Sequence, residues 1–387
     1  MILLRRTNLK TFPSILSMIR KMSDTSPTED ILFHIENKCG VITLNKPKAL
    51  NSINMKMTQA INAHLKKWED QVSMVIIRGV GKAFCAGGDI KESVEKGPNN
   101  SQGAKEFFKL DYTNDYIIAN YKHPYIAIMD GYTMGSGVGL SINGRYQVAT
   151  EKTLLAMPET AIGLFPDVGA SYFLPRLPGN MGMLIALTGS RLKGVDCVKV
   201  GLASHYCNSE NIPGLVERLI ATGGSVKAIE STLNELCPNV NNLHFSLAGK
   251  EKIVDTIFGL SSIESIFDAL EKEGSDWSKE VLATMKKMSP LSLKVTHREM
   301  TLGKTLSLKE CLQMEYRLCH RALEAKFSND FYEGVRALLI DKDRNPKWNP
   351  AELNDISSST VDQYFTQLPP GEEMTFKCDI KLNNIYY

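Results

Sequence analysis

The sequence predicts an α/β protein in which a β-rich first half is followed by a helical second half. Short β-prone runs separated by glycine-containing turns recur through the first half, in an irregular strand, strand, helix order. Between residues 245 and 340 the apolar residues follow helical spacing, and we find no convincing strand there. This order is typical of an α/β core with a helical C-terminal region. A length of 387 residues accommodates one large domain or two ordinary ones.

Composition and charge argue against two classes of partner. With 43% hydrophobic and 23% charged residues, the chain has the composition of an ordinary soluble globular protein. Its formal net charge is only +2, and no basic tract lies among aromatic residues, so we expect no nucleic-acid partner. No uninterrupted apolar run approaches the length of a membrane span, so we expect no membrane partner either.

The first 27 residues differ from the rest of the chain. They are rich in Lys, Arg, Ser and Thr, contain no acid before Asp24, and place apolar residues so that they could line one helical face. A secretory signal would need an unbroken apolar centre, which is missing here. We interpret residues 1–27 as a mitochondrial transit peptide, which predicts a mitochondrial matrix protein. The alternative is a disordered basic arm.

The first elements follow directly from local patterns. Two β-prone runs, Ile31–Glu36 and Val41–Asn45, lie on either side of a turn signal at residues 37–40 and predict a hairpin. Residues 51–54 then offer caps for an amphipathic helix that ends near Glu69.

A continuous apolar run at residues 74–78 predicts a strand buried in a sheet. It leads through a glycine-containing loop to Asp89, which we expect to cap a helix that begins at Ile90. Further along we expect a mobile loop at 97–102, strands at 125–129, 148–149 and 154–156, and helices at 104–121, 181–188, 194–201, 213–221, 224–236 and 312–325.

The cysteines and histidines indicate neither a disulfide framework nor a metal site. No C-x-x-C pair occurs, and no set of cysteines or histidines has the spacing of metal ligands. We therefore expect free thiols that are mostly buried, and neither a metal nor a cofactor. The cysteines are at positions 39, 85, 197, 207, 237, 311, 319 and 378.

Two glycine-containing loops that follow predicted strands are candidates for binding an anionic oxygen. In the first, residues 83–89, small residues would let a ligand lie against the backbone, with the amide N–H of Ala86 as a donor. Considered alone, this loop is better explained as a plain strand-to-helix turn with Asp89 as the N-cap. The second, residues 134–139, has neither dinucleotide-binding nor P-loop spacing and lacks the first glycine of a nucleophile elbow. Two such loops with one N–H each would make an oxyanion hole.

Two carboxylates follow the second loop, each directly after a proline. Glu159 follows Pro158 and Asp167 follows Pro166, in a partly apolar stretch that would raise their pKa values. A lone carboxylate in such a place usually caps a helix or begins a turn. Two of them near amide-donating loops instead favour acyl or enolate chemistry with acid–base exchange.

These segments resemble the crotonase, or enoyl-CoA hydratase/isomerase, superfamily, from about residue 31 to about residue 350. Residues 83–89, 131–139 and 157–159 are similar to its motifs, and residues 45–51 are similar to its CoA-contacting loop. The longer stretches 158–169, 172–176, 333–337 and 346–348 resemble members of this superfamily that hydrolyse a short hydroxyacyl-CoA thioester in valine breakdown.

The resemblance implies a spiral of ββα units over residues 28–235 and a helical C-terminal region over residues 236–387. It implies that Ala86 and Ser136 supply the oxyanion-hole amides, that Glu159 and Asp167 are catalytic, and that an acyl-CoA is the substrate. The resemblance also implies which residues contact the ligand. The implied substrate contacts are Asp111, Ser136, Glu159 and Asp167, and the implied CoA contacts are Lys48, Ala49, Leu50, Ala86, Gly88 and Asp89.

Two positions separate hydrolysis from hydration within the superfamily. The hydratases have a glutamate where Gly139 stands and a glycine where Asp167 stands, so the carboxylate pair that handles the added water is missing here. We therefore expect a thioester hydrolase. The alternatives are a hydratase or isomerase of the same fold and a non-catalytic, ribosome-associated mitochondrial relative; a homo-oligomer stays open. Ser136 replaces a usual glycine, and Asp111 replaces a usual glutamate.

Overall fold

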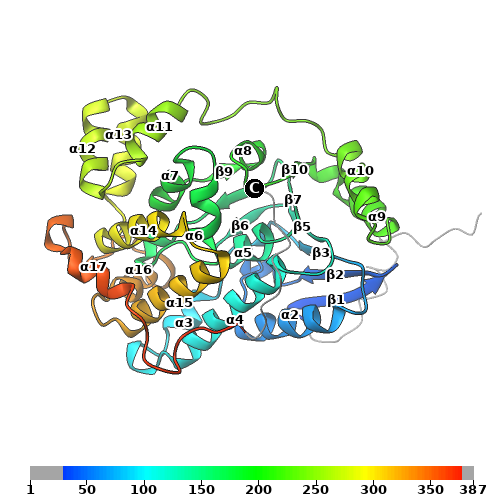
Figure 1. Cartoon of the computed structure of the whole chain (residues 1–387), viewed down its shortest axis with the longest axis horizontal. Helices are drawn as coiled ribbons and strands as arrows, with labels where there is room; N and C mark the ends of the chain where they lie inside the picture. Colours follow the sequence, from blue (N-terminus) through cyan, green and yellow to red (C-terminus); the bar gives the residue numbers. More distant parts are fainter. Residues whose placement is uncertain (1–28, 377–387) are drawn as a thin grey trace, which may run out of the picture.

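The described residues form two β-sheets, and the larger one extends to the right-hand side of the molecule in Figure 1. The structure, a computed structural model, describes residues 29–376; the predicted transit peptide and Cys378 therefore lie outside the described residues. The larger sheet has the strand order β1 (Ile31–Glu36), β2 (Cys39–Leu44), β3 (Met74–Gly79), β5 (Tyr125–Met129), β7 (Tyr146–Ala149), β10 (His205–Tyr206). The smaller has the order β4 (Ala83–Cys85), β6 (Tyr132–Met134), β8 (Leu154–Ala156), β9 (Leu192–Lys193).

The strands follow one another as a spiral. A strand of the larger sheet leads to a strand of the smaller sheet and then to a helical segment, in the successive units β3–β4–α3, β5–β6–α5 and β7–β8–η3. Pairing is parallel throughout except for β1 with β2 and β8 with β9. The predicted α/β spiral of ββα units with a helical C-terminal region is therefore confirmed.

Helices cover both sides of this spiral and make up the second half. Those of the first half are α2 (Met55–Trp68), α3 (Ile90–Val94), α4 (Gln102–Ala119), α5 (Ser136–Ile142), the 3-10 turn η3 (Glu159–Ile162), α6 (Ala170–Phe173), α7 (Met181–Thr188), α8 (Val195–Lys199), α9 (Ile212–Ala221) and α10 (Val226–Leu236). Those of the second half are α11 (Glu251–Phe258), α12 (Ile263–Glu273), α13 (Asp276–Met285), α14 (Pro290–Gly303), α15 (Leu308–Glu324), α16 (Asp330–Val335), the π-helical turn η6 (Arg336–Ile340) and α17 (Ser358–Tyr364). None of these helices is long and apolar enough to cross a membrane.

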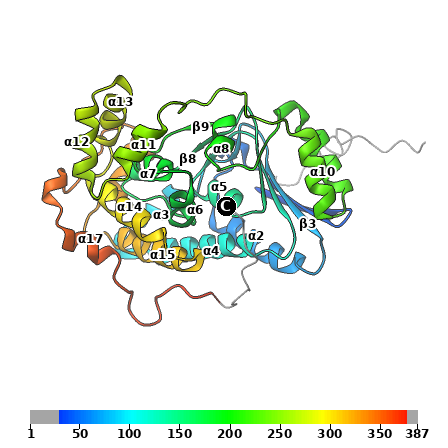
Figure 2. The same ribbon diagram turned by 45° about the horizontal axis from the view of Figure 1, so that its top comes forward.

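Alternation along the strands divides the core into two layers. Val75 and Ile77 of β3 belong to the large cluster that includes α2 and α4, whereas Met74 and Ile76 belong to a smaller cluster beneath α9 and α10. Successive side chains of a strand point to opposite faces, so both faces of the sheet are buried. In Figure 2 the strands accordingly stand between α10 on one side and α2, α4 and α5 on the other.

The helical second half packs onto the spiral as part of one core. A long connection, residues 237–250, runs from α10 across to α11 (Figure 1). Beyond it, α15 packs along α4, and α14 packs against α6 and α7. The large hydrophobic cluster contains residues from both halves. The predicted boundary between the spiral and the helical C-terminal region, at residue 235, falls at the end of α10, and this division of the chain stays a prediction.

Three local predictions differ from the structure. The hairpin turn is shorter than expected: only Asn37 and Lys38 have positive φ, 46° and 60°, whereas Cys39 already lies in β2. Asp89 precedes α3 but its side chain does not cap the helix; it forms an ion pair of 3.5 Å with Lys46 instead.

The predicted glycine loop at residues 134–139 is only partly a loop, since residues 136–142 form α5. Two glycines in it serve packing rather than a ligand. A Cβ at Gly137 would lie 2.8 Å from the Cβ of Cys85 and closer still to its carbonyl oxygen. A Cβ at Gly139 would lie 2.6 Å from a carboxyl oxygen of Asp115. These glycines let α5 lie directly on β4 and α4.

Candidate active site

The two predicted carboxylates lie together in the interior, next to the start of α5. Glu159 is the first residue of η3, and Asp167 lies in the loop that leads to α6; their side chains are only 6% and 5% exposed. The hydroxyl of Tyr112, on α4, donates to Oδ2 of Asp167 at 2.8 Å. A Cβ at Gly135 would lie 3.3 Å from Oε1 of Glu159, which places that carboxyl beside the residue that precedes α5.

Burial raises the pKa of both carboxyl groups above their ordinary values. It raises the pKa of Asp167 to about 7, against the opposing effect of the hydrogen bond from Tyr112. Burial and then the charge of Asp167 raise the pKa of Glu159 well above its ordinary value. Because the two groups interact, they titrate as a pair rather than singly. Oε2 of Glu159 has no hydrogen-bond partner among residues 29–376.

The structure corrects one of the two predicted amide donors. The N–H of Ala86 donates to the carbonyl oxygen of Leu50 at 3.0 Å, so it is not available to a ligand, and its prediction as an oxyanion donor is wrong. The N–H of Gly88, two residues on, has no acceptor in the described part of the chain. A Cβ at Gly88 would lie 3.3 Å from Oγ of Ser136, so the two backbones approach closely here.

Ser136 begins α5, and the first amides of a helix have no intrahelical acceptor. Its predicted N–H donor therefore stays available, and Gly88 is the second donor that the geometry offers beside it. Ser136 directly follows Gly135, the residue beside the carboxyl group of Glu159, and Gly88 lies against the side chain of Ser136. Amides fixed in this way can stabilise an oxygen on which negative charge develops.

The two positions that depart from the superfamily pattern contact each other. The hydroxyl of Ser136 donates to Oδ2 of Asp111 at 2.6 Å, and both side chains are buried. Burial raises the pKa of Asp111 to about 6, and the hydroxyl of Ser136 moderates that rise. The shorter acid, Asp111, is thus hydrogen-bonded to the added hydroxyl of Ser136, so the two departures form one feature.

The predicted CoA-binding residues gather at one edge of the site. Lys48 and Ala49 form a 3-10 turn with Pro47, and Leu50 follows with a φ of 51° and an exposed side chain. The side chain of Asn51 donates to the carbonyl oxygens of Val80 and Ala83, which fixes this turn against β4.

A groove continues from this edge between α3 and α4. Its lining includes Asn54, Met55, Asp89, Ser93, Lys96 and Phe107. Phe107 also faces Gly88, where a Cβ would lie 3.2 Å from its ring. The groove therefore connects the predicted CoA contact Asp89 with the amide of Gly88, and Phe107 was not identified from the sequence.

Sequence reasoning also missed four buried residues around the carboxylates: Tyr112, Asp115, Glu299 and Glu315. Tyr112 has no local signal, because its partner Asp167 is 55 positions away. Glu315 had one: it lies at helical spacing from the buried Leu312 and Cys319, on the apolar face of α15. A charged residue on such a face is a candidate for a specific interior role.

Comparison with known proteins gives a consistent result. The family described as "Enoyl-CoA hydratase/isomerase" matches residues 39–365. The chain is 47% identical to the protein named "3-hydroxyisobutyryl-CoA hydrolase, mitochondrial" from Xenopus tropicalis, over 85% of this chain and 86% of that protein. It is 41% identical to the Homo sapiens protein of the same name, over 94% of each.

Solved structures agree with this similarity. A carnitinyl-CoA dehydratase from Mycobacterium thermoresistibile superposes with a TM-score of 0.84 at 34% identity, covering 90% of this chain and 99% of that one. An enoyl-CoA hydratase from Rhodobacter sphaeroides 2.4.1 superposes with a TM-score of 0.82 at 32% identity, covering 90% of this chain and 100% of that one.

Proposed function

The chain belongs to the enoyl-CoA hydratase/isomerase family, and we propose that it hydrolyses the thioester of 3-hydroxyisobutyryl-CoA to 3-hydroxyisobutyrate and CoA. The observation that carries this proposal is the buried pair Glu159 and Asp167 beside two unoccupied amide donors. The names of the relatives supply the acyl group and a mitochondrial location. The reaction would be a step of valine breakdown.

In this mechanism the thioester carbonyl oxygen accepts hydrogen bonds from the backbone N–H groups of Gly88 and Ser136. Each well-placed donor contributes about 3–4 kcal/mol to stabilising the tetrahedral intermediate. Glu159 either attacks the carbonyl carbon or removes a proton from an attacking water. In the first case an acyl–oxygen bond forms, the C–S bond breaks, CoA leaves as a thiolate that takes up a proton, and water hydrolyses the mixed anhydride. Asp167 either takes up the proton of that water or accepts a hydrogen bond from the substrate hydroxyl. Asp111 also contacts this hydroxyl.

Hydration of a double bond is the closest rival reaction, and the surroundings of Gly139 argue against it. The hydratases that the sequence resembles have a glutamate at this position. Here a Cβ would lie 2.6 Å from Oδ1 of Asp115 and 2.7 Å from the Cβ of Val168, so a glutamate could not be accommodated without moving α4 or the Asp167 loop. Loss of the conjugated absorbance of crotonyl-CoA without release of thiol would support hydration instead.

The decisive test is thiol release from a panel of short hydroxyacyl-CoA esters by the full chain and by Glu159→Gln. We expect release from 3-hydroxyisobutyryl-CoA, and a fall in kcat of roughly 100- to 10,000-fold in the variant with little change in KM, because the amide cannot act as nucleophile or base. Glu217→Gln, at an exposed position of α9, is the matched control and should keep full activity. Near-normal turnover in Glu159→Gln would show that Glu159 takes no part in the chemical step.

Isotopic labelling then separates the two roles of Glu159. A single turnover in ¹⁸O-labelled water leaves label in the side chain of Glu159 if the mixed anhydride forms and water attacks its glutamyl carbon. Label found only in the released acid arises both from a general base and from water attack on the acyl carbon of the anhydride, so the absence of an acyl adduct on Glu159 in a rapidly quenched turnover, measured by mass spectrometry, is the result that establishes Glu159 as the general base. We further propose that catalysis needs no metal or cofactor and that the chain assembles as a homo-oligomer. Activity after treatment with a chelator and sedimentation of the purified chain test these two points.

A further inference from the structure

The loop that carries Asp167 has an unusual backbone. Val168 has a φ of +56°, and Gly169 follows with a φ of +89°. Glycine adopts such values freely, but a β-branched residue in the left-handed region is a genuine outlier, because its Cβ approaches the neighbouring carbonyl. Val168 is fully buried. A strained conformation of this kind persists only where the surrounding structure holds it.

One side chain from the second half of the chain holds the residues that follow Val168. Oε2 of Glu315 accepts the N–H of Gly169 at 2.7 Å, and Oε1 accepts the N–H of Ser171 at 2.9 Å and its hydroxyl at 2.6 Å. Glu315 lies on α15 and is completely buried. Helix α6 begins directly after Gly169 and has no side-chain cap of its own, so Glu315 supplies from α15 the acceptors that a local cap would provide.

The other side of the loop is held less firmly. The side-chain amide of Asn143 donates to the carbonyl oxygen of Val168 at 3.4 Å, a long hydrogen bond. Ahead of Val168, the carboxyl group of Asp167 has the hydroxyl of Tyr112 as its hydrogen-bond partner. The backbone conformation at Val168 therefore sets where Asp167 points, and Glu315 makes the shortest contacts that maintain this conformation.

We propose that Glu315 is a positioning residue for thioester hydrolysis: by holding Gly169 and Ser171 it keeps Val168 left-handed and Asp167 beside Glu159. Glu315 contacts no reacting atom, so it acts only through the loop. The inference rests on the proposed function, and it adds a device in which α15 of the helical half fixes a carboxylate of the spiral. Removing that device should loosen Asp167 without weakening the binding of CoA.

The test uses Glu315→Gln in the full chain. Glutamine keeps one acceptor but turns an NH₂ donor toward the N–H groups of the loop. We expect kcat for 3-hydroxyisobutyryl-CoA to fall by about 10- to 100-fold while KM changes by less than about threefold, the size of effect that a misplaced catalytic group produces. Hydrogen exchange of the peptide covering residues 165–173, measured without substrate, should become faster.

A second substitution distinguishes positioning from general loss of packing. Adding Val168→Gly to Glu315→Gln should restore at least about fivefold of the lost kcat, because glycine adopts a positive φ without strain and the loop no longer needs the clamp. Adding Val168→Ala instead removes the same methyl groups but keeps the Cβ, and should not restore activity.

Several results would overturn the inference. They are a normal kcat in Glu315→Gln, unchanged hydrogen exchange at residues 165–173, or a glycine double variant no better than the alanine one. If Glu315→Gln does not fold, Ser171→Ala, which removes one of the three donors, is judged by the same two measurements. If the wild-type chain releases no thiol, the proposed function fails, and the hydrogen-exchange result still decides whether Glu315 holds the loop.

Discussion

Buried carboxyl groups surround the candidate active site and dominate its chemistry. Burial is the largest cause that raises the pKa of each, and repulsion by neighbouring carboxylates adds to it for all of them except Asp111. Some accept hydrogen bonds, as Asp167 and Glu315 do, whereas others have no partner within residues 29–376. The group consists of Asp111, Asp115, Glu159, Asp167, Glu299 and Glu315.

The titration of Glu159 and Asp167 predicts the pH dependence of catalysis. Either role of Glu159 requires a carboxylate, and burial raises the pKa of both members of the pair, that of Asp167 to about 7. Activity is therefore lost as the pH falls through this range. We expect kcat/KM to rise up to about tenfold per pH unit as the pH is raised from 5.5 through 7, the range in which Asp167 loses its proton. A profile that is flat from pH 5.5 to 8 would indicate carboxylates of ordinary pKa and contradict this prediction.

Glu299 gives a stability prediction with the opposite pH dependence. Both of its oxygens lack a partner in the described residues, and burial, followed by the charge of Glu315, raises its pKa well above the ordinary value of 4.5. Above pH 4.5 the unfolded chain loses this proton while the folded chain keeps it, so stability falls as the pH rises. Glutamine mimics the protonated acid and does not ionise.

We therefore expect Glu299→Gln to leave the free energy of unfolding nearly unchanged at pH 5 and to raise it at pH 8. Urea unfolding at both pH values measures this, with Glu217→Gln as the exposed control. Equal effects of Glu299→Gln at the two pH values would show that Glu299 is already ionised in the folded protein.

At the scale of single elements, helix α5 matters most because it carries Ser136. It lies so close to β4 that a side chain at Gly137 would collide with the carbonyl oxygen of Cys85. Glycine is a poor helix former, so the two glycines of α5 would make this segment a weak helix by itself. Close packing between backbones stabilises it instead, and that packing also fixes the amide of Ser136.

Gly137→Ala should therefore affect both stability and activity. We expect a loss of about 1–3 kcal/mol in the free energy of unfolding, because overpacking forces the helix away from β4. The amide of Ser136 should move with the helix, so kcat should fall as well. Gly214→Ala in α9, where a Cβ meets nothing within 4 Å, is the matched control and should be neutral or slightly stabilising. Equal melting temperatures for the two variants would contradict this account.

Short elements explain most of the differences between prediction and structure. The helix expected at residues 181–188 has those bounds in α7, because its apolar run and the following Gly189 mark it locally. The strands β4 and β6 were not predicted: each has only three residues, which is too few for alternation to be recognised. They form because each pairs with its neighbours in the smaller sheet.

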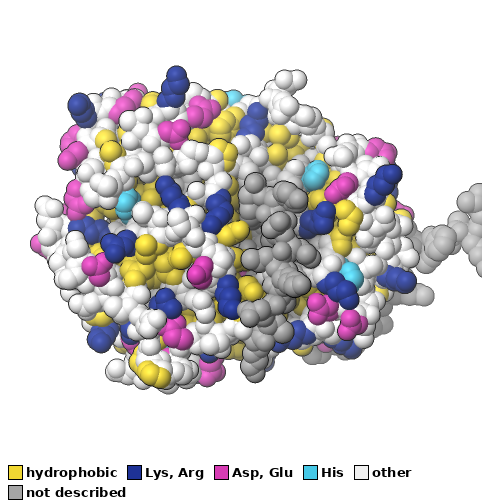
Figure 3. Space-filling model, viewed as in Figure 1, with side chains coloured by type: hydrophobic (Ala, Val, Ile, Leu, Met, Phe, Trp, Pro, Cys, Tyr) yellow, Lys and Arg dark blue, Asp and Glu magenta, His cyan; other side chains and the backbone are white. Residues whose placement is uncertain are grey.

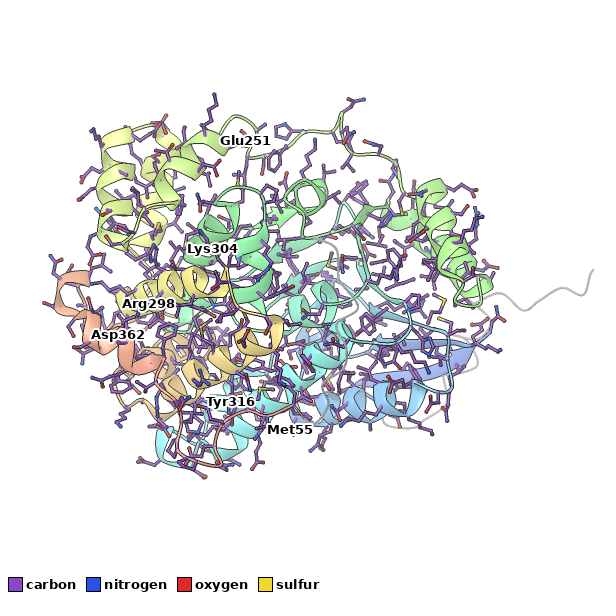
Figure 4. The ribbon with its side chains drawn as sticks, viewed as in Figure 1. Met55, Glu251, Arg298, Lys304, Tyr316 and Asp362 are labelled. Carbon is purple, nitrogen blue, oxygen red and sulfur yellow. The ribbon has the colours of Figure 1, made fainter. Side chains whose placement is uncertain are left out.

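At the scale of the whole molecule, the helical second half completes the interior of the spiral. Figure 4 labels Arg298 on α14 and Asp362 on α17, which form an ion pair of 3.0 Å where the last helix packs on its neighbour. Tyr316 of α15, also labelled there, has the ammonium nitrogen of Lys109, on α4, above its ring at 5.8 Å from the ring centroid.

Basic and acidic side chains are interspersed over the described part of the face in Figure 3, in keeping with the small net charge.

The sequence by itself determined the α/β class, the long helices and strands, and the two carboxylates, because periodicity, glycine-containing turns and the motif residues are local features of the chain. Its catalytic assignments for Glu159 and Asp167 stay predictions. Only the tertiary structure decided which amides are unoccupied, replacing Ala86 by Gly88, and which distant side chains surround the acids. The physical reason is that hydrogen-bond satisfaction and burial depend on contacts between residues far apart in sequence, such as Glu315 and Gly169, which no local pattern records.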